Sequence, residues 1–302
     1  MTEVSTAPTE HTPSLNARVF GSVPPTVLVL LGIVSVQLGS AVAKHLFPVV
    51  GSFGTVALRL FFAAAVLLLV WRPSVRLSRR AWTVVLGYGV VLGLMNLCFY
   101  LALARIPLGI AVTVEFLGPL AVALAGSRRW LDVVWVALAG SGVFLLMEGG
   151  GELNLAGLLF AVAAGALWGL YILVGAALGR HTTEGNGLAL GMAIAACIAV
   201  PVGVADSGTA LLHPGVLIAG LGVALLSSVV PYTLDLEALR RIPPNVFGIL
   251  MSLEPAVAAV IGLVVLQEAL LGTQWLAVVC VVIASAGATL GARPKNQAQP
   301  TN

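Results

Sequence analysis

The chain has 302 residues, of which 59% are apolar and only 9% are charged. An ordinary soluble domain is about 45–50% apolar and about 25% charged, so this composition excludes a soluble globular protein. The formal net charge is +3. Because the charged residues lie mainly in short gaps between apolar runs, we interpret the positive balance as membrane topology and expect no nucleic-acid partner.

Residues 1–23 are polar and rich in proline and threonine, unlike the apolar chain that follows. They lack the basic and apolar regions of a cleavable signal peptide. We expect residues 1–23 and 292–302 to be cytoplasmic tails, the first of them disordered.

Ten apolar segments are long enough to cross a bilayer, which takes about 20 residues of helix. Several tryptophans fall near the predicted ends, as expected at a membrane interface, and the two-residue alternation of barrel strands is missing. The sequence therefore predicts an all-α integral membrane protein. The predicted spans are about 24–44, 50–71, 81–104, 107–125, 130–147, 153–178, 187–205, 214–238, 243–267 and 270–291.

The basic residues predict the orientation, because lysine and arginine are retained on the cytoplasmic side. With the N-terminus inside, twelve of the fourteen basic residues in loops and tails are cytoplasmic, and only Lys44 and Arg105 face out. We therefore expect both termini in the cytoplasm. The twelve are Arg18, Arg72, Arg76, Arg79, Arg80, Arg128, Arg129, Arg180, Arg240, Arg241, Arg293 and Lys295.

The two halves of the chain share a pattern. Arg105-Ile106-Pro107 aligns with Arg241-Ile242-Pro243, and without a gap Gly118-Pro119 then lies over Glu254-Pro255. Five spans per half is an odd number, so the second copy must be inverted, and inverted repeats are typical of alternating-access transporters with a site near the midplane. The alternative is that Arg-Ile-Pro is simply a common way to begin a helix. The predicted five-helix repeats are residues 24–147 and 153–291.

Two proline-centred motifs resemble a known family. Residues 111–122, together with 228–232 and 252–256, are similar to the EamA family of the drug/metabolite transporter superfamily, and most similar to its bacterial threonine/homoserine exporter branch. The resemblance covers about residues 25–291. It implies ten helices in two inverted five-helix bundles around a central cavity, and export of amino acids or related metabolites across the bacterial cytoplasmic (inner) membrane.

Two glutamates lie near the centres of predicted spans, where an ionised side chain costs roughly 2.5–3.5 kcal/mol and usually faces a cavity or a partner. In the repeat alignment Glu254 superposes on Gly118, three residues beyond Glu115 and on nearly the same helical face. We expect both glutamates to bind substrate or protons in one cavity. The alternative is a protonated glutamate that holds two helices together. Pro119 and Pro255 should each free a carbonyl one turn back and expose polar backbone there.

Two basic residues lie within or at the end of spans. Arg59 sits about ten residues into the second span and keeps its charge, so we expect Glu115 as its partner. Arg59 either binds a substrate carboxylate or holds a proton-carrying glutamate ionised, and a buried structural ion pair is equally compatible. Lys44 lies at the outer end of the first span, where an interfacial anchor is the favoured alternative to a site residue.

Several other polar side chains are candidates. Asp235 and Glu237 are two residues apart, so at most one faces the cavity, and we expect Glu237 to be solvated near two arginines. Glu268 is expected to mark the water boundary after the ninth span. Interhelical bonding or packing is the simpler explanation for each remaining candidate alone, although together they would orient a small zwitterion: Gln37, Asn96, Tyr100, Trp168, Tyr171 and Tyr232.

The leading hypothesis is a secondary active exporter that is no enzyme, whose substrate is an amino acid such as threonine or homoserine. No Walker motif occurs, so the proton gradient is the natural energy source, with Glu115 or Glu254 as proton carrier. The alternatives are an uncoupled metabolite carrier or a drug exporter of the same fold. A different class, an intramembrane enzyme, lacks its motif, because His45, His181 and His213 sit at span ends.

The partners we expect are the substrate, protons and the lipid bilayer. Cys98, Cys197 and Cys280 are far apart and without CxxC spacing, so we expect no disulfide, metal site or cofactor.

Overall fold

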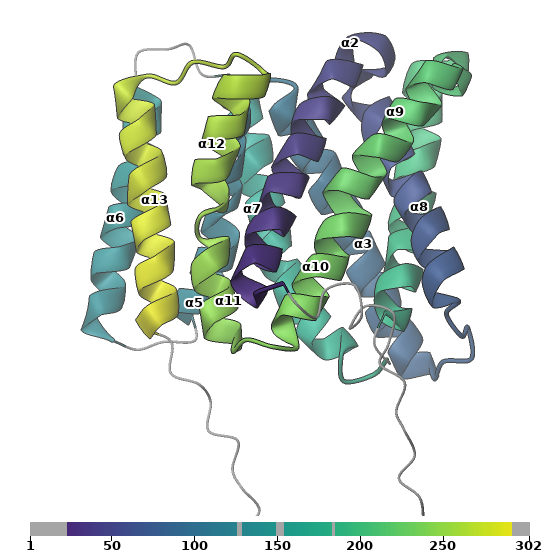
Figure 1. The fold of residues 1–302 in the computed structure, drawn as a ribbon, viewed down its shortest axis with the longest axis horizontal. Coiled ribbons are helices and arrows are strands. Elements are labelled where there is room, and N and C mark those ends of the chain that lie inside the picture. The colour runs from purple at the N-terminus through teal and green to yellow at the C-terminus, as the bar shows by residue number, and fades with distance from the viewer. Residues whose placement is uncertain (1–22, 126–128, 149–153, 183–184, 292–302) are drawn as a thin grey trace, which may run out of the picture.

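A computed structural model describes residues 23–125, 129–148, 154–182 and 185–291, and each regular element in these ranges is a helix. The expected tails at 1–23 and 292–302 lie outside the described residues, apart from Val23. The helices stand side by side in an upright bundle (Figure 1). Their bounds are α2 Pro25–Trp71, α3 Arg79–Leu103, α4 Leu108–Glu115, α5 Leu117–Ala125, α6 Trp130–Glu148, α7 Leu155–Leu178, α8 Asn186–Ser207, η1 Gly208–Leu212, α9 Pro214–Ala224, η2 Leu225–Val229, α10 Val230–Leu239, α11 Pro244–Met251, α12 Glu254–Val265 and α13 Gly272–Gly291.

Among the described residues, 8 helical segments are long and apolar enough to cross a membrane. One of these segments is α2, whose 47 residues are about twice the length that a bilayer requires. Its backbone leaves helical geometry at Val50 and at Gly51, which has a φ of 63°. Glycine adopts a positive φ without steric cost, so α2 turns here. The predicted spans 24–44 and 50–71 both fall within α2. A shorter apolar helix, Trp130–Leu146, lies in α6.

Two helices are broken near their middles, at positions 136 residues apart. The first half-helix, α4, ends at Glu115, and α5 follows after Phe116. The second, α11, ends at Met251, and α12 begins at Glu254. A proline blocks the helical bond to the carbonyl four residues earlier. Pro119 and Pro255 therefore explain the two ends, because α4 and α11 stop four residues before them.

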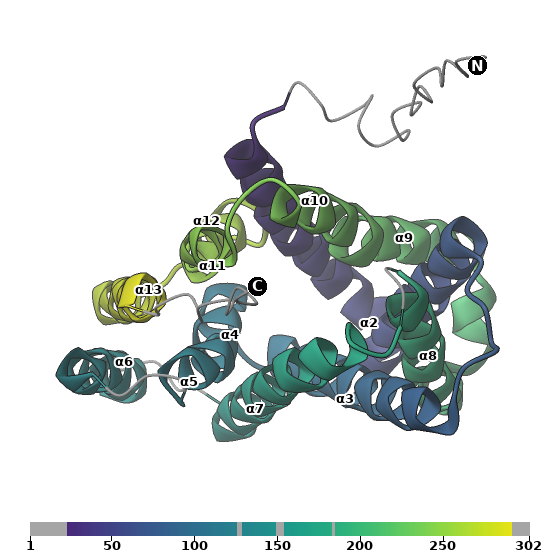
Figure 2. The ribbon, with the colours of Figure 1, turned by 90° about the horizontal axis from the view of Figure 1, so that it is seen from below.

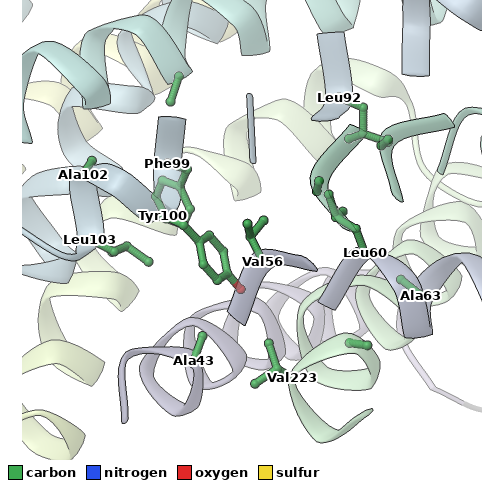
Figure 3. Packing of buried hydrophobic residues seen from close by; sticks show 14 of the residues in the cluster. Ala43, Val56, Leu60, Ala63, Leu92, Phe99, Tyr100, Ala102, Leu103 and Val223 are labelled. Atoms are coloured by element: carbon green, nitrogen blue, oxygen red, sulfur yellow. The ribbon is translucent and has the colours of Figure 1, made fainter. Parts of the chain in front are cut away.

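The bundle is held by close packing of small and apolar side chains (Figure 3). Tyr100 of α3 is fully buried, and Figure 3 shows its ring pointing toward Val56 of α2, with Ala43 and Val223 nearby. Helices α6 and α13 form a pair at one edge of the bundle (Figure 2).

The described chain begins and ends at the same end of the bundle, the lower end in Figure 1. We call this end the terminal end and the other the opposite end. The turns that follow α2, α7 and α10 lie at the terminal end. The kink of α2 and the start of α4 lie at the opposite end.

Candidate functional site

A cavity of about 750 Å³ lies between the two halves of the chain. At the terminal end its lining runs to the helix ends, where it includes Trp71, Gly185 and Leu239. Toward the opposite end the lining stops about one turn short of the helix ends, at residues such as Phe99 and Val112. The cavity therefore reaches the terminal end only.

Arg59 of α2 is buried and lines this cavity. Its guanidinium donates to the backbone oxygen of Ser227 at 3.0 Å and, less closely, to the hydroxyls of Ser228 at 3.3 Å and Tyr100 at 3.4 Å. It also lies 5.5 Å from the centroid of the Tyr100 ring. None of the ion pairs among the described residues includes Arg59. The expected ion pair with Glu115 is therefore not present, and the guanidinium charge is available to a ligand.

Glu115 is the last residue of α4 and lines the cavity from the broken helix. It lies within electrostatic range of both Glu254 and Arg59. Within the described chain, no side chain forms a hydrogen bond with its carboxyl group. Behind it, the backbone oxygen of Glu115 lies against Gly165 of α7, where an added Cβ would approach to 2.6 Å. The glycine allows α7 to pack directly on the break.

Glu254 opens α12 and faces the same cavity from the second broken helix, as the repeat alignment predicted. The side-chain amide of Gln37 donates to its Oε1 at 3.1 Å, whereas its Oε2 has no partner. Because Gln37 belongs to α2 and Glu254 to α12, this bond joins the two halves of the chain. The expectation that Glu115 and Glu254 approach one cavity is confirmed.

Asp235 and Glu237 of α10 have different surroundings. Asp235 lines the cavity, and its Oδ1 is buried without a hydrogen-bond partner. Glu237 is not among the lining residues, so the expectation that at most one of the two faces the cavity is confirmed. The expectation that Glu237 is solvated is wrong. It is 5% exposed and pairs with Arg241 one turn later and with Arg240, because a buried carboxylate needs a cation in place of water.

An aromatic wall faces these polar groups. Trp168 and Tyr171 of α7 line the cavity, together with Tyr232 of α10. Trp168 meets Phe116 edge to face, with ring centroids 5.4 Å apart, and the Tyr171 hydroxyl lies 2.8 Å from that of Tyr88. These contacts hold the Trp168 and Tyr171 rings in place beside the cavity.

Four of the predicted site residues do not line the cavity. Tyr100 lies behind Arg59, Pro255 is buried within α12, and Lys44 is at the opposite end. Gly118 instead packs on α7, where an added Cβ would overlap the backbone oxygen of Gly165. Asn96 lines the cavity, and its Nδ2 donates to the backbone oxygen of Leu92 within α3.

The sequence interpretation missed a group of hydroxyls. Ser40 and Ser227 are buried, line the cavity and have no partner for their hydroxyl oxygens. Ser227 lies in η2, a π-helical turn, and such turns often mark functional sites. The motif already noted begins at Ser228, one residue after Ser227, but a serine in an apolar run carries no charge that singles it out.

Side chains from both halves tie the opposite end together. Lys44 forms an ion pair with Glu268 and donates to the backbone oxygen of Ile106 at 2.9 Å. The other carboxylate oxygen of Glu268 accepts from the backbone N–H of Leu108 at 2.7 Å. Lys44 is therefore bound within the protein, and Glu268 does more than mark a water boundary.

The site can hold a small molecule that carries both charge signs. One guanidinium and three carboxyl groups from four helices surround a cavity with an apolar, aromatic side, and hydrogen bonds are strengthened where apolar walls lower the local dielectric constant. No cluster of three or more potential metal ligands occurs among the described residues.

Comparisons with known proteins agree with this description. The model of the EamA-like transporter family matches residues 155–290. The chain is 44% identical over 277 residues to the threonine/homoserine exporter RhtA of Escherichia coli (strain K12), which covers 90% of this chain and 94% of the relative. The same values hold for RhtA of Salmonella typhimurium (strain LT2). A solved crystal structure, 21% identical, has a TM-score of 0.61 over 88% of this chain and 98% of its own, and shows the fold alone.

Proposed function

Because the chain belongs to the EamA-like transporter family, we propose that it exports amino acids such as threonine and homoserine from the cytoplasm by proton antiport. Substrate and direction are those of the threonine/homoserine exporters that this chain matches along 94% of their length. The observation that carries the proposal is the cavity, in which Arg59 and three carboxyl groups face one space. A zwitterion offers the complementary pair of charges.

The orientation follows from the basic residues. The described turns at the terminal end carry eight arginines, and the opposite end carries Lys44 and Arg105. By the positive-inside rule the terminal end is cytoplasmic, so the cavity in this structure opens toward the cytoplasm. A reporter protein fused after Asn302 should then be active only inside the cell, and activity only in the periplasm would refute this orientation. The eight arginines are Arg72, Arg76, Arg79, Arg80, Arg129, Arg180, Arg240 and Arg241.

Alternating access is the mechanism that the architecture supports. Dividing α2 at its kink and adding α6 gives ten spans, five in each half. The matched breaks at Phe116 and Ser252 support an inverted repeat, in which the substrate site lies between the copies and each copy closes one side in turn.

Proton coupling requires a group that binds a proton in one state and releases it in the other. Glu115 fits this role, because it lies near mid-membrane in the cavity and no side chain of the described residues bonds its carboxyl group. Its solvation changes when the cavity changes sides, and so does its preference for the charged form. Substrate leaving and proton entering would then use the same cavity at different times.

Transport into inverted membrane vesicles tests this function. Labelled threonine is supplied outside, with and without an acidic vesicle interior, and vesicles without the protein are the control. We expect uptake that depends on the protein and is several-fold faster with the gradient. Equal uptake with and without it would replace antiport by facilitated transport, and no uptake of any amino acid would refute the export function.

A further inference from the structure

Five buried side-chain oxygens or hydroxyls in the described chain have no hydrogen-bond partner, and all belong to residues that line the cavity. An unpaired buried polar atom costs about 1–3 kcal/mol, so five around one space point to a ligand that satisfies them. The five are Gln37 Oε1, Ser40 Oγ, Ser227 Oγ, Asp235 Oδ1 and Glu254 Oε2.

Three of these atoms are carbonyl or carboxylate oxygens, from Gln37, Asp235 and Glu254 on three different helices. All three residues line one cavity, where Gln37 bonds the other oxygen of Glu254 and Asp235 lies within electrostatic range of Glu254. An ammonium group has three N–H donors and no acceptor, so it complements three such oxygens. A carboxylate on the ligand would instead be repelled by the carboxylates of Asp235 and Glu254.

The charges around the cavity point the same way. Arg59 is the one basic residue among the described lining residues, against Glu115, Asp235 and Glu254. The Arg59 guanidinium is already bonded to Ser227 and Ser228 of η2. A cationic group of a ligand is therefore favoured beside the carboxyl groups of Asp235 and Glu254.

We propose that Gln37, Asp235 and Glu254 form the subsite for the α-ammonium group of the exported molecule. This inference rests on the proposed function and adds a requirement: the substrate must be a free amine. The Gln37 amide holds Glu254 in place and turns its own oxygen to the same donor. Glu115 is left for the proton, so charge recognition and coupling use different carboxyl groups.

The test is competition in exchange across proteoliposomes at equal pH on both sides, so that coupling plays no part. Labelled threonine is exchanged against unlabelled threonine, N-acetylthreonine or the corresponding 2-hydroxy acid, which lack the ammonium group. We expect these two to compete about 10–100-fold less well, the range of a lost charged hydrogen bond. Equal competition would overturn the subsite while leaving the export function intact. No threonine exchange at all would refute both.

Single substitutions test which residues produce the preference for a free ammonium group. Asp235→Asn and Glu254→Gln keep the shape and should narrow the preference for threonine over N-acetylthreonine at least several-fold. Asp206→Asn is the matched control, because Asp206 is an exposed acid outside the cavity. Folded protein is verified by gel filtration. A variant that folds, exchanges threonine and keeps the full preference would overturn the assignment of its residue.

A different observation carries a second inference. The ion pair of Lys44 with Glu268 joins the first half to the second at the end where the cavity is closed. The side chains are 20% and 18% exposed, so water screens the pair only in part. Its further bonds to the backbone at Ile106 and Leu108 fix the start of α4 beneath it.

The sequence supplies a counterpart at the other end. Gly39–His45 reads GSAVAKH and Gly175–His181 reads GAALGRH, at the same spacing of 136 residues that relates the two Arg-Ile-Pro turns. Arg180 therefore corresponds to Lys44, and Ile242 to Ile106. In this structure Arg180 is exposed at the terminal end, and no ion pair among the described residues includes it.

We infer that the Lys44–Glu268 pair locks the outer side of this state, and that Arg180 locks the inner side of the outward-open state by donating to the Ile242 carbonyl. In an inverted repeat the two states exchange the conformations of the two halves, so a contact of one half predicts its counterpart in the other. This inference also rests on the proposed function.

Labelling from outside tests both locks. In a cysteine-free background, Met95→Cys places a thiol on the cavity wall, where an impermeant reagent reaches it only when the outer side opens. Lys44→Gln and Glu268→Gln should each raise the labelling rate of this thiol several-fold. The exchanged pair K44E/E268K should restore the low rate of the unchanged background. Arg180→Gln should lower the rate. Arg105→Gln and Arg79→Gln, exposed cations at the two ends, should leave it unchanged.

The opposite signs separate locks from ordinary structural damage, which would move labelling in one direction for all variants. Unchanged labelling in Lys44→Gln would overturn the outer lock. Equal or faster labelling in Arg180→Gln would overturn the inner one. In either case threonine exchange by the wild-type protein is unaffected, so the export function is judged separately.

Discussion

The two broken helices use the same backbone device but place their acids differently. In the first, Glu115 is the last residue of α4, and in the second, Glu254 is the first residue of α12. The proline lies four residues after the end of each half-helix. The first break has Gly118 where the second has Glu254, and there α7 packs directly on the backbone.

This difference gives the two carboxyl groups different electrostatic surroundings. A helix N-terminus favours negative charge and a C-terminus opposes it. Glu254 therefore lies at the helix end that favours a carboxylate, and it also accepts from Gln37. Glu115 lies where its carboxylate is opposed, with Arg59 in range but not in contact. Glu254 is suited to hold a cation, whereas Glu115 is suited to gain and lose a proton.

The largest effect is expected from Glu115→Gln. The amide keeps the shape but carries no titratable proton, so gradient-driven uptake of threonine into inverted vesicles should fall to the level of vesicles without the protein. Exchange at equal pH should persist. If purified Glu115→Gln transports at near wild-type rate with an unchanged response to the gradient, Glu115 is not the proton carrier.

Glu254→Gln should give the reverse pattern. We expect the threonine concentration for half-maximal exchange to rise by about 10-fold or more, because a charged hydrogen bond becomes a neutral one. The remaining transport should still respond to the gradient, since Glu115 is unchanged. Measuring both properties in both variants sharpens the comparison, and a variant pair with identical defects would show that the two acids act as one unit.

Sequence patterns predicted much of this molecule, because its strongest constraint is also its simplest. A bilayer demands long apolar helices, so the spans could be placed within a few residues. The prolines predicted a freed carbonyl one turn back, and the helices end there, since a proline blocks a specific backbone bond. Glu115 and Glu254 were recognisable because a carboxyl group in an apolar run is costly.

Contacts between distant segments could not be predicted. The partner of Arg59 was expected to be Glu115, but the π-turn η2 brings Ser227 and its carbonyl closer, and nothing in the sequence marks such a turn. Glu237 was expected in water because two arginines follow it, yet the fold buries it against them. Lys44 and Glu268 are 224 residues apart.

Gly118→Ala tests why the first break has no acid at this position. The new Cβ would overlap the Gly165 carbonyl oxygen, so α5 and α7 would have to separate. Overpacking of this kind costs about 1–3 kcal/mol, and we expect a lower melting temperature and weaker transport. Gly140→Ala is the matched control, because nothing lies within 4 Å of its added Cβ. Equal melting temperatures for the two variants would argue against the close contact.

The smallest effect is expected from replacing Cys98, Cys197 and Cys280 together by alanine. Cys98 lies within electrostatic range of Glu115 but does not line the cavity, and the other two are remote in sequence from both breaks. A thiol behaves as a small apolar group in a core, so the changes remove little packing. We expect threonine exchange and its response to a pH gradient within about two-fold of wild type, measured side by side in proteoliposomes. Loss of the gradient response alone would implicate Cys98 in the coupling at Glu115, and would show that the first break depends on a group that has no counterpart in the second.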